Sequence, residues 1–292
     1  MSMLKTSRKY AEILGVKVGS THKAGVLREL RGKIARGEKF FIVTPNPEIV
    51  IEAQKDKELF RILNSADISI ADGIGLCAAY KFLKLPRQKG FLKKLLTFFI
   101  QGLGVAFLTF FDKTSLTKEL PLIKGRELFL DLIAIANKKS WKVILLGDKL
   151  LSAQKAAFKL KLNYKKVRIH GLTGPDLDKR GTPLGKTDKN LQQRVIEKIN
   201  KFKPELLFVG FGAPKQEKWV YKNFANLNIG GAMVVGGTFD FISGKSVLPP
   251  KIIEDRDLEW LWRIAVGHQN LKRVRKAFPE FPARIFFEKL KE

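Results

Sequence analysis

Six short apolar runs, separated by longer amphipathic stretches, constrain the fold of this 292-residue sequence more than any other feature. Each run is rich in β-branched or aromatic residues and nearly continuous in hydrophobicity, which is typical of strands covered on both faces. Strands that alternate with helical segments predict an α/β fold, in which helices cover a parallel sheet. The runs are KFFIV (39–43), DISIA (67–71), WKVILLG (141–147), KVRIHG (166–171), ELLFVG (205–210) and GAMVVGG (231–237).

Two of the intervening stretches, residues 47–64 and 125–138, carry apolar side chains at helical spacing. Because the chain alternates in this way, any ligand is expected beside the carboxyl ends of the strands. The apolar positions are Ile49, Ile51, Ala53, Leu59, Phe60 and Leu63 in the first stretch, and Leu128, Phe129, Leu132, Ile133 and Ala136 in the second.

The charge balance is strongly basic, with 55 Lys and Arg against 28 Asp and Glu, a formal net charge of +27. Such a field attracts nucleic acid, an anionic membrane face or phosphorylated substrates. A genome whose proteins are rich in lysine in general would give the same charge balance without any such partner. The single cysteine, Cys77, cannot form an internal disulfide, and the first twenty residues have no apolar core of a signal peptide. Both features indicate a reducing cytosol.

Residues 86–121 interrupt the alternating pattern with an uncharged run, Leu95 to Phe111, that is rich in Phe and Leu. At ~1.5 Å per residue a helix over this run spans about 25 Å, short of the ~30 Å hydrocarbon core of a bilayer. Gly102 and Gly104 fall in its middle. We expect an interfacial or re-entrant helical hairpin; a single membrane span and a buried pair of core helices are the alternatives.

The C-terminal segment, residues 251–292, is expected to form an appendage to a core spanning residues 1–250. Its aromatic side chains, such as Trp262 and Phe286, alternate with bases, such as Arg263 and Arg284. This mixture suits a membrane surface, where apolar burial and attraction to anionic lipid add together. The same mixture would also stack on RNA bases.

The stretch TPNPE ends the first apolar run. Thr44 places a hydroxyl at the carboxyl edge of the sheet, and Pro45 and Pro47 hold Asn46 in an extended conformation. Pro47 is also suited to the first turn of a helix, where Glu48 would meet the positive end of the dipole. An ordinary strand–helix turn with Asn46 as the cap explains the motif as well as a ligand site does.

The second run ends in ADGIG, which places Asp72 at the same edge, followed by Gly73 and Gly75. Glycines let a backbone approach a ligand closely. An acid at this position acts as a helix cap, a ribose ligand or a general base. The first βα turn has no GxGxxG, which counts against a dinucleotide-binding dehydrogenase or epimerase.

Two later runs end in the same way. In VGFGAPKQE, Gly210 and Gly212 are followed by Pro214, which is expected to open a helix whose amides receive phosphate oxygens. Lys215, Gln216 and Glu217 fall in that first turn. In VVGGTFDFISG, Gly237 is followed by Asp240 and Phe241. Four such turns at one sheet edge predict a pocket for a polar, phosphorylated ligand.

Five motifs occur in an order and spacing that is similar to one family: VTPNPEIV, ADGIG, VGFGAPKQE, GGTFDFISG and LEWLWRI. The sequence resembles the WecG/TagA/CpsF glycosyltransferases (glycosyltransferase family 26) over roughly residues 11–86 and 120–275. The resemblance implies a Rossmann-like core with a C-terminal helical appendage. It implies inverting transfer of an N-acetylmannosamine-type sugar from a UDP-sugar to N-acetylglucosamine on undecaprenyl diphosphate, with no metal or other cofactor. The implied location is peripheral, on the cytoplasmic face of the plasma membrane, where the lipid-linked acceptor and the anionic membrane surface are the partners.

The resemblance also assigns roles to residues. Asp72 is expected to be the general base, with Thr44 and Asn46 beside it in the catalytic pocket. The UDP leaving group is then stabilised by amide donors and cations. Besides Gly73, Lys215, Gln216, Glu217 and Asp240, the expected substrate-binding residues are Gly210, Gly212 and Gly237 with the cations Lys124, Arg126, Arg263 and Arg273.

Three departures from the family pattern affect the cations. The segment before residue 125 reads LPLIKG without the usual Arg, so Lys124 and Arg126 are expected to substitute for it. Leu248 stands where an Arg is usual, and the appendage keeps Arg263 and Arg273 but has Asn270 in place of a third Arg. The set of cations that is expected to bind the diphosphate is therefore either supplied by other residues or weaker than usual. These departures also leave open which sugar the donor carries.

The alternative from another class is a basic nucleic-acid-binding protein on a catalytically dead core. Four glycine turns around an acid are not what a polyanion groove needs, so no nucleic-acid partner is expected. His22, His170 and His268 lack metal-ligand spacing and are expected on the surface or in loops. The sequence leaves a homo-oligomer possible.

Overall fold

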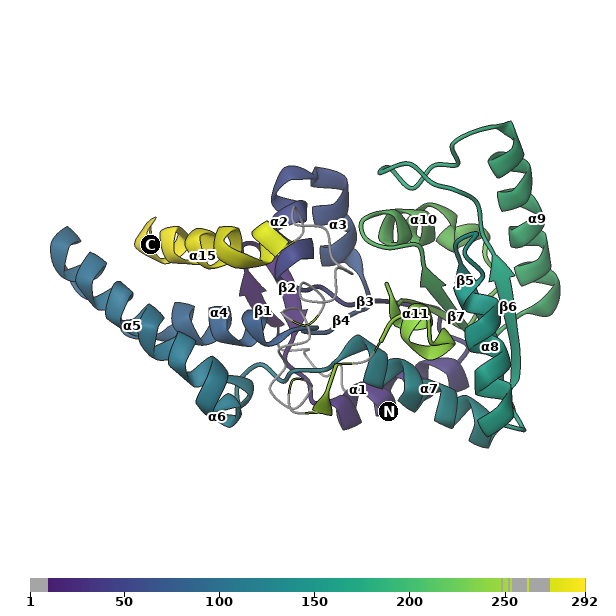
Figure 1. The fold of residues 1–292 in the computed structure, drawn as a ribbon, viewed down its shortest axis with the longest axis horizontal. Helices are drawn as coiled ribbons and strands as arrows, with labels where there is room; N and C mark the ends of the chain where they lie inside the picture. The colour runs from purple at the N-terminus through teal and green to yellow at the C-terminus, as the bar shows by residue number, and fades with distance from the viewer. Residues whose placement is uncertain (1–9, 248, 252, 254–261, 263–273, 292) are drawn as a thin grey trace, which may run out of the picture.

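The structure, a computed structural model, describes residues 10–247, 249–251, 253, 262 and 274–291. Its centre is a six-stranded parallel sheet in the order β4-β3-β8-β7-β5-β6 (Figure 1). All six predicted runs are strands of this sheet, so the α/β prediction is confirmed. The strands are β3 (Phe40–Val43), β4 (Ile68–Ser69), β5 (Lys142–Gly147), β6 (Arg168–Thr173), β7 (Leu206–Gly210) and β8 (Gly231–Val234).

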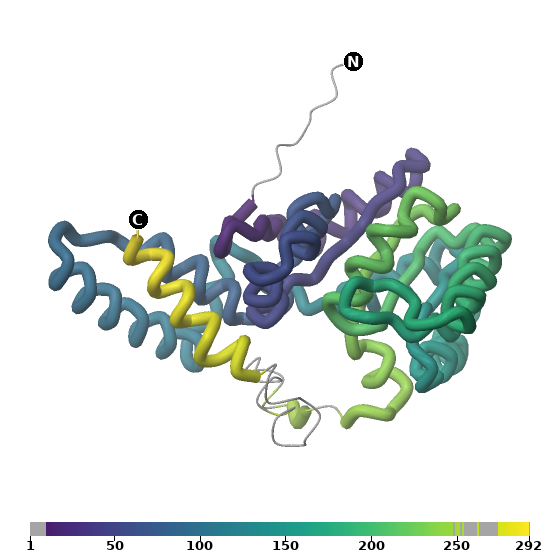
Figure 2. Tube along the Cα trace, turned by 90° about the horizontal axis from the view of Figure 1, so that it is seen from above, coloured from purple at the N-terminus to yellow at the C-terminus, as the bar shows by residue number. Residues whose placement is uncertain are grey.

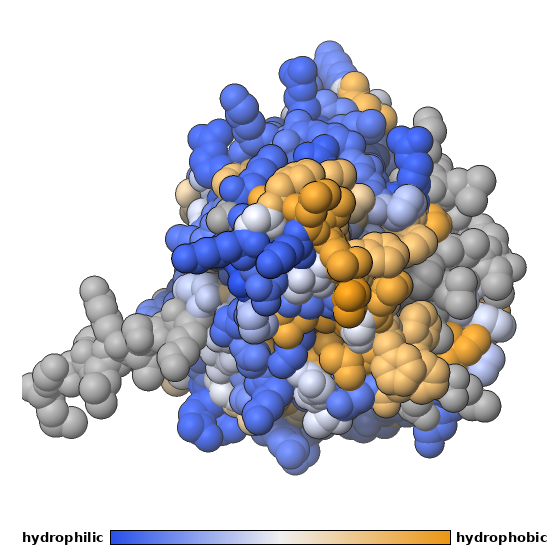
Figure 3. All heavy atoms as spheres, turned by 90° about the vertical axis from the view of Figure 1, so that its left-hand side faces the viewer, coloured by the Kyte–Doolittle hydropathy of each residue, from blue (hydrophilic) through white to orange (hydrophobic). Residues whose placement is uncertain are grey.

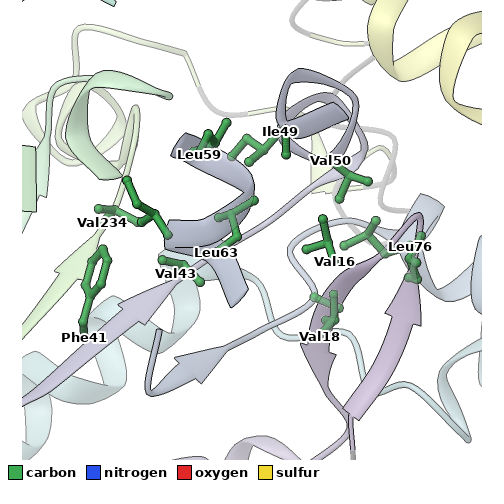
Figure 4. Close-up of a cluster of buried hydrophobic side chains, with 14 of the residues drawn as sticks. Val16, Val18, Phe41, Val43, Ile49, Val50, Leu59, Leu63, Leu76 and Val234 are labelled. Carbon is green, nitrogen blue, oxygen red and sulfur yellow. The ribbon is translucent and has the colours of Figure 1, made fainter. Parts of the chain in front are cut away.

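Alternate residues of each strand enter two separate cores, one on each face of the sheet, because side chains in a strand point to opposite faces in turn. Phe41 and Val43 of β3 pack into the first core, and Phe40 and Ile42 pack into the second. Figure 4 shows part of the first core, where Val43 lies near Leu63 and Phe41 near Val234. The first core is covered by α2 (Pro47–Lys55), α3 (Lys57–Ser65), α4 (Ile74–Lys84), α9 (Lys186–Phe202) and α10 (Lys215–Asn223), and the second by α1 (Lys23–Ala35), α7 (Gly125–Lys139), α8 (Ser152–Asn163) and α11 (Thr238–Ser243).

Residues 47–64 form two helices that are separated at Asp56. The Asp56 carboxylate accepts a hydrogen bond from the Leu59 backbone N–H at 3.0 Å and so caps α3. Its extended backbone (φ −129°) ends α2 at the same point. Capping chemistry therefore divides a stretch that is uniform in its hydrophobic spacing. The second predicted stretch is one helix, α7, whose five apolar positions are all buried.

A short antiparallel hairpin, β1 (Tyr10–Ile13) and β2 (Val16–Gly19), precedes the sheet and was not predicted. Its inward positions pack against α3 and α4 in the first core. The turn consists of Leu14 (φ 49°) and Gly15 (φ 74°), both in the left-handed region that a two-residue hairpin turn requires. Leucine rarely adopts this conformation, so the turn carries no clear sequence signal.

The apolar segment forms one continuous helix, α5 (Phe91–Phe111), followed by α6 (Lys113–Thr117). The prediction of a helical hairpin was wrong, because a helical glycine costs only about 1 kcal/mol and does not by itself break a helix. Gly102 faces α4, where a Cβ would make an ordinary van der Waals contact with the Phe82 ring at 3.8 Å. A buried pair of core helices is also wrong: only 11% of the most apolar part of α5 is buried. By length and composition α5 could cross a membrane.

The chain returns to α5 at its C-terminal end. After a short π-helical turn, η2 (Lys276–Glu280), helix α15 (Phe281–Lys291) packs against α2, α4 and α5. Figure 2 shows α15 lying beside α5 at the end of the molecule opposite α9. Phe286 stacks on Phe82 with 6.2 Å between ring centroids. Lys289 is fully buried, with its Nζ over the Phe82 ring. The division at residue 250 stays a prediction.

Candidate active site

The carboxyl ends of β3 and β4 meet the first turn of α7. The Asp72 backbone N–H donates to the carbonyl oxygen of Pro45 at 3.0 Å, which ties the two strand ends together. The Gly125 backbone N–H donates to Asp72 Oδ1 at 3.1 Å. A Cβ on residue 125 would lie 3.4 Å from Asp72 Oδ2 and 3.5 Å from Thr44 Cγ2. The structure therefore brings Thr44 and Asp72 together, as predicted, with Gly125 as a third member that sequence reasoning missed.

Gly125 lies at the first position of α7, so its amide belongs to the positive end of the helix dipole. This amide stabilises negative charge on the Asp72 carboxylate and holds one of its oxygens in place. A Cβ at residue 125 would make ordinary van der Waals contact with the carboxylate and Thr44, so the first turn of α7 lies directly beside both. The KG pair at residues 124–125, directly before an apolar helical pattern, was the available signal.

Asn46 caps α2, because its Oδ1 accepts a hydrogen bond from the Ile49 backbone N–H at 2.9 Å. Pro47 occupies the first turn and Glu48 lies in it, as predicted. The cap interpretation of this motif is confirmed. A catalytic role for Asn46 stays a prediction.

The glycines of ADGIG serve packing as well as conformation. Gly73 has a φ of 135°, which other residues rarely adopt. A Cβ on Gly75 would lie 2.8 Å from Pro47 Cγ. The start of α4 therefore packs directly on the TPNP turn, and Gly75 is needed for this contact between helices.

Arg126 links the start of α7 to α11, the helix that follows β8. Its guanidinium lies over the Phe241 ring of α11, 5.3 Å from the centroid. Arg126 and the helix-capping residue Lys124 lie on either side of Gly125, so both predicted cations flank the amide that binds Asp72.

Gln216 joins the loops that follow β7 and β8. Its Oε1 accepts hydrogen bonds from the backbone N–H groups of Gly212 and Gly236, each at 3.1 Å. Its Nε2 donates to Glu217 Oε1 at 3.0 Å. Gln216 and Glu217 are 2% and 1% exposed. These bonds fit a positioning role for both side chains, which hold two glycine loops at one fixed separation.

The glycines of these loops differ in what they do. A Cβ on Gly210 would lie 2.8 Å from the Phe239 ring, so Gly210 serves packing. Gly212, Gly236 and Gly237 have no atom within 4 Å of such a Cβ, and the first two have positive φ angles of 77° and 52°. These three glycines expose backbone to open space at the strand ends, which is the arrangement that a close-fitting ligand requires.

The connections that leave the sheet mark this edge as the place where a ligand is expected. The chain leaves β3 through α2, on the first face of the sheet, and leaves the neighbouring β8 through α11, on the second face. Adjacent strands whose connections diverge in this way leave a crevice at their carboxyl ends. Asp72 with Thr44 lies on one side of this point and the Gly236–Gly237 loop on the other.

Asp240 is held by other parts of the protein. Its Oδ1 accepts a hydrogen bond from Ser152 Oγ of α8 at 2.5 Å and lies 3.6 Å from Lys245 Nζ.

Lys215 lies half-buried in the first turn of α10, and Pro214 caps that helix, close to the predicted position. Arg263 and Arg273 lie outside the described residues, as do Leu248, Trp260 and His268.

The ends of β5 and β6 carry polar residues that sequence reasoning missed. Lys149 Nζ lies 2.7 Å from Asp176 Oδ2 and 3.0 Å from Asp188 Oδ1. The Asp188 carboxylate also accepts the Asp176 backbone N–H, and these bonds lower the pKa of Asp188. The stretches LLGDK (145–149) and LTGPD (172–176) place a glycine and an acid together at a strand end, as ADGIG does in the opposite order, and this was the signal that could have found them.

Within the described part of the chain, no three His, Cys, Asp or Glu side chains gather as a metal site would require. Transfer without a metal stays a prediction. His22 and His170 are exposed, as expected, and His170 packs against the Phe202 ring.

Comparison with known proteins agrees with the motifs. The family model described as "Glycosyl transferase WecG/TagA/CpsF family" matches residues 11–92 and 89–292. The second match runs through α5, so the similarity extends over a segment from which the five motifs are absent. Proteins from Staphylococcus aureus strains NCTC 8325, COL and MW2 are each 27% identical over 279 residues, covering 94% of this chain and 91% of the relative. They carry the name N-acetylglucosaminyldiphosphoundecaprenol N-acetyl-beta-D-mannosaminyltransferase.

Family similarity over nearly the whole length, the parallel sheet and the convergence of the TPNP, ADG and GAPKQE turns at one sheet edge lead to one conclusion. This chain belongs to the WecG/TagA/CpsF family of glycosyl transferases.

Proposed function

We propose that the protein transfers an N-acetylmannosamine-type sugar from a UDP-sugar to N-acetylglucosamine on undecaprenyl diphosphate. The acceptor and the sugar follow the name of the S. aureus relatives. The observation that supports a reaction at this sheet edge is the Asp72 carboxylate, which is held by the Gly125 amide, with Thr44 next to the same glycine.

The proposed reaction inverts the anomeric carbon. The acceptor hydroxyl oxygen attacks that carbon while Asp72 takes the hydroxyl proton, and the bond to UDP breaks with its electron pair leaving on the diphosphate. The Gly125 amide keeps the carboxylate oriented for this proton transfer. Thr44 and Asn46 line the same pocket and position the two sugars.

The leaving group needs positive charge and amide donors. The amides of Gly212 and Gly236 already donate to Gln216, so these glycines support nucleotide binding through the open space beside them and Gly237, which lets a diphosphate approach the β7 and β8 loops near Lys215. Arg126 and Lys124 supply cations from α7 and Arg263 and Arg273 from the C-terminal segment, with arginine preferred for bidentate contacts to phosphate.

A peripheral position on the cytoplasmic membrane face completes the proposal. Most of the outer surface of α5 is apolar and exposed, including Phe99 (58%), Leu103 (58%) and Phe107 (60%). Figure 3 shows apolar side chains gathered on this end of the molecule. Residues 81–94 add six Lys or Arg and no acid. An apolar helix beside a cationic cluster suits an anionic bilayer surface. Because α4 and α15 pack along one side of α5, we propose that α5 lies in the membrane surface and does not cross it.

The experiment that tests the function is transfer by the purified protein to a synthetic lipid-diphosphate-N-acetylglucosamine, followed by mass spectrometry of the product. UDP-N-acetylmannosamine is compared with other UDP-sugars, with and without EDTA. An added N-acetylhexosamine that appears only with one donor supports the proposal, and activity in EDTA supports transfer without a metal. Absence of product with every donor would overturn it.

Nucleic-acid binding is the second candidate, favoured by the net charge of +27. Tight oligonucleotide binding with a steep salt dependence and no UDP affinity would replace the glycosyl transfer proposal.

A further inference from the structure

A groove of about 360 Å³ lies between α4 and α5, away from the Asp72 site. This volume is at the lower end of the ~300–1,000 Å³ that is usual for ligand sites. Its surface is almost wholly apolar. The groove is lined by Lys81, Leu85, Gln101, Gly104, Val105, Phe107 and Leu108.

The two polar side chains of the groove already have partners within the protein. Gln101 donates from Nε2 to the carbonyl oxygen of Pro86 at 2.8 Å, and its Oε1 accepts from Lys289 Nζ at 2.7 Å. Lys81 Nζ lies 3.6 Å from Glu119 Oε1. A ligand that must hydrogen-bond gains little here, whereas a hydrocarbon loses nothing, so the groove suits a hydrocarbon chain.

Helix α4 connects this groove to the catalytic edge. The residue before the helix, Gly73, directly follows Asp72, and Lys81 lies eight residues further on, about 12 Å along the helix axis. Lys81 and Lys84 are the cations of the 81–94 segment that lie on α4, and each pairs with Glu119. A lipid diphosphate whose sugar reaches Asp72 would therefore extend along α4 before its chain reaches the groove.

We propose that this groove binds the head-proximal isoprene units of the polyprenyl diphosphate acceptor, an inference that rests on the proposed function. The groove is too small for the whole chain, so the remainder stays in the bilayer that α5 contacts. The cationic segment beside the groove matches a diphosphate and anionic lipid, and it disfavours a second copy of this basic chain as the occupant.

Gly104 offers a direct test. A Cβ on Gly104 would have no atom within 4 Å, so Gly104→Leu fills the groove without a clash, and the loss of a helical glycine favours the helix. Ala106→Leu is the matched control, because Ala106 is an exposed residue of the same helix that does not line the groove. Both variants add apolar bulk to α5, so an effect of membrane affinity alone would appear in both.

The measurement compares KM for an undecaprenyl-diphosphate acceptor with KM for an acceptor that carries a short alkyl chain. We expect Gly104→Leu to raise KM for the polyprenyl acceptor about tenfold, corresponding to ~1.4 kcal/mol, and to leave the short-chain KM unchanged. Photo-cross-linking with a benzophenone-labelled farnesyl diphosphate should label residues of α5 in the wild type and in Ala106→Leu, and should fail in Gly104→Leu.

The outcomes separate the two proposals. Normal transfer by Gly104→Leu to both acceptors, with unchanged cross-linking, would overturn the groove assignment and leave the transferase function intact. Absence of transfer by the wild type to either acceptor would overturn the function itself. Loss of a dimer in Gly104→Leu, seen by light scattering without a change in cross-linking, would identify a second copy as the occupant and also overturn the assignment.

Discussion

The Gly125 backbone N–H donates to the Asp72 carboxylate at 3.1 Å, although the two residues are 53 positions apart. This bond joins the end of β4 to the start of α7. It leaves residue 125 no room for a side chain without contact to the carboxylate and Thr44. The catalytic proposal depends on this arrangement, because it fixes where the carboxylate oxygens lie.

Asp72→Asn is expected to lower the transfer rate at least a hundredfold, within the ~10²–10⁴ range of general base catalysis. The Asn side-chain oxygen can still accept the Gly125 amide, so the free energy of unfolding should change little. Steady-state kinetics and thermal unfolding check both expectations. Asp131→Asn, a change at a half-buried residue of α7 whose carboxylate pairs with Lys23, is the control and should leave the rate unchanged. Wild-type activity in Asp72→Asn would remove Asp72 as the base.

Gln216→Ala is expected to lower the free energy of unfolding by about 2–3 kcal/mol. The change deprives the Gly212 and Gly236 amides of their shared acceptor and the Glu217 carboxylate of a donor. It should also raise KM for the UDP-sugar, since the two glycine loops lose their fixed separation. Urea unfolding and donor titration test the two effects. Gln193→Ala, an exposed change on α9, should stay within ~0.5 kcal/mol of the wild type. An unchanged donor KM in a destabilised Gln216→Ala would show that the loops do not bind the nucleotide.

Lys289 predicts a specific pH dependence of stability. Its ammonium group is buried between Phe82 and Phe98, donates to the Phe82 carbonyl oxygen at 2.6 Å, and lies near the cationic Arg87. Burial lowers the pKa of Lys289 from 10.5 to about 8. Between these values the unfolded chain binds more protons than the folded one, so this group makes the protein more stable as pH rises from about 8 to 10.5.

The measurement is the free energy of unfolding of the wild type and of Lys289→Met, from urea titrations at pH 7 and pH 10.5. Methionine fills similar space without a charge. The wild type should therefore gain stability relative to the variant at the higher pH, and comparing the two proteins cancels the other groups that titrate in this range. If the free energies of unfolding of the wild type and Lys289→Met differ by the same amount at both pH values, the burial of a charged Lys289 is contradicted.

Phe99→Glu and Leu103→Glu are expected to reduce binding to vesicles that contain anionic lipid by about tenfold or more. Both side chains are exposed on α5, so the fold should be retained, whereas a carboxylate on the membrane-facing side opposes apolar burial and is repelled by anionic lipid. Co-sedimentation with vesicles of phosphatidylglycerol and phosphatidylcholine measures the effect. Phe158→Glu on α8 is the control, with 66% of the residue exposed at a distance from α5. Equal binding by all three variants would exclude α5 as the membrane contact.

Local sequence patterns determined the strands, the class of fold and most of the residues at the sheet edge that carries the proposed site. Continuous apolar runs such as KFFIV have to be covered on both faces, and polar residues that follow such runs have to lie at the strand ends. Asp72 and Thr44 could therefore be placed without knowledge of the neighbouring helices. The TPNP turn likewise carried its own capping information in Asn46 and Pro47.

Only the tertiary structure decided which of these turns touch and what each side chain binds. Gly125 reaches Asp72, and Gln216 joins the amides of Gly212 and Gly236, because helices packed on the two faces of the sheet bring distant loops together. The continuity and exposure of α5 were decided in the same way, since Phe82 provides the surface on which Gly102 packs. Periodicity along a chain records which side of each element is apolar. It does not record which other element covers that side, because that choice depends on the packing of the whole core.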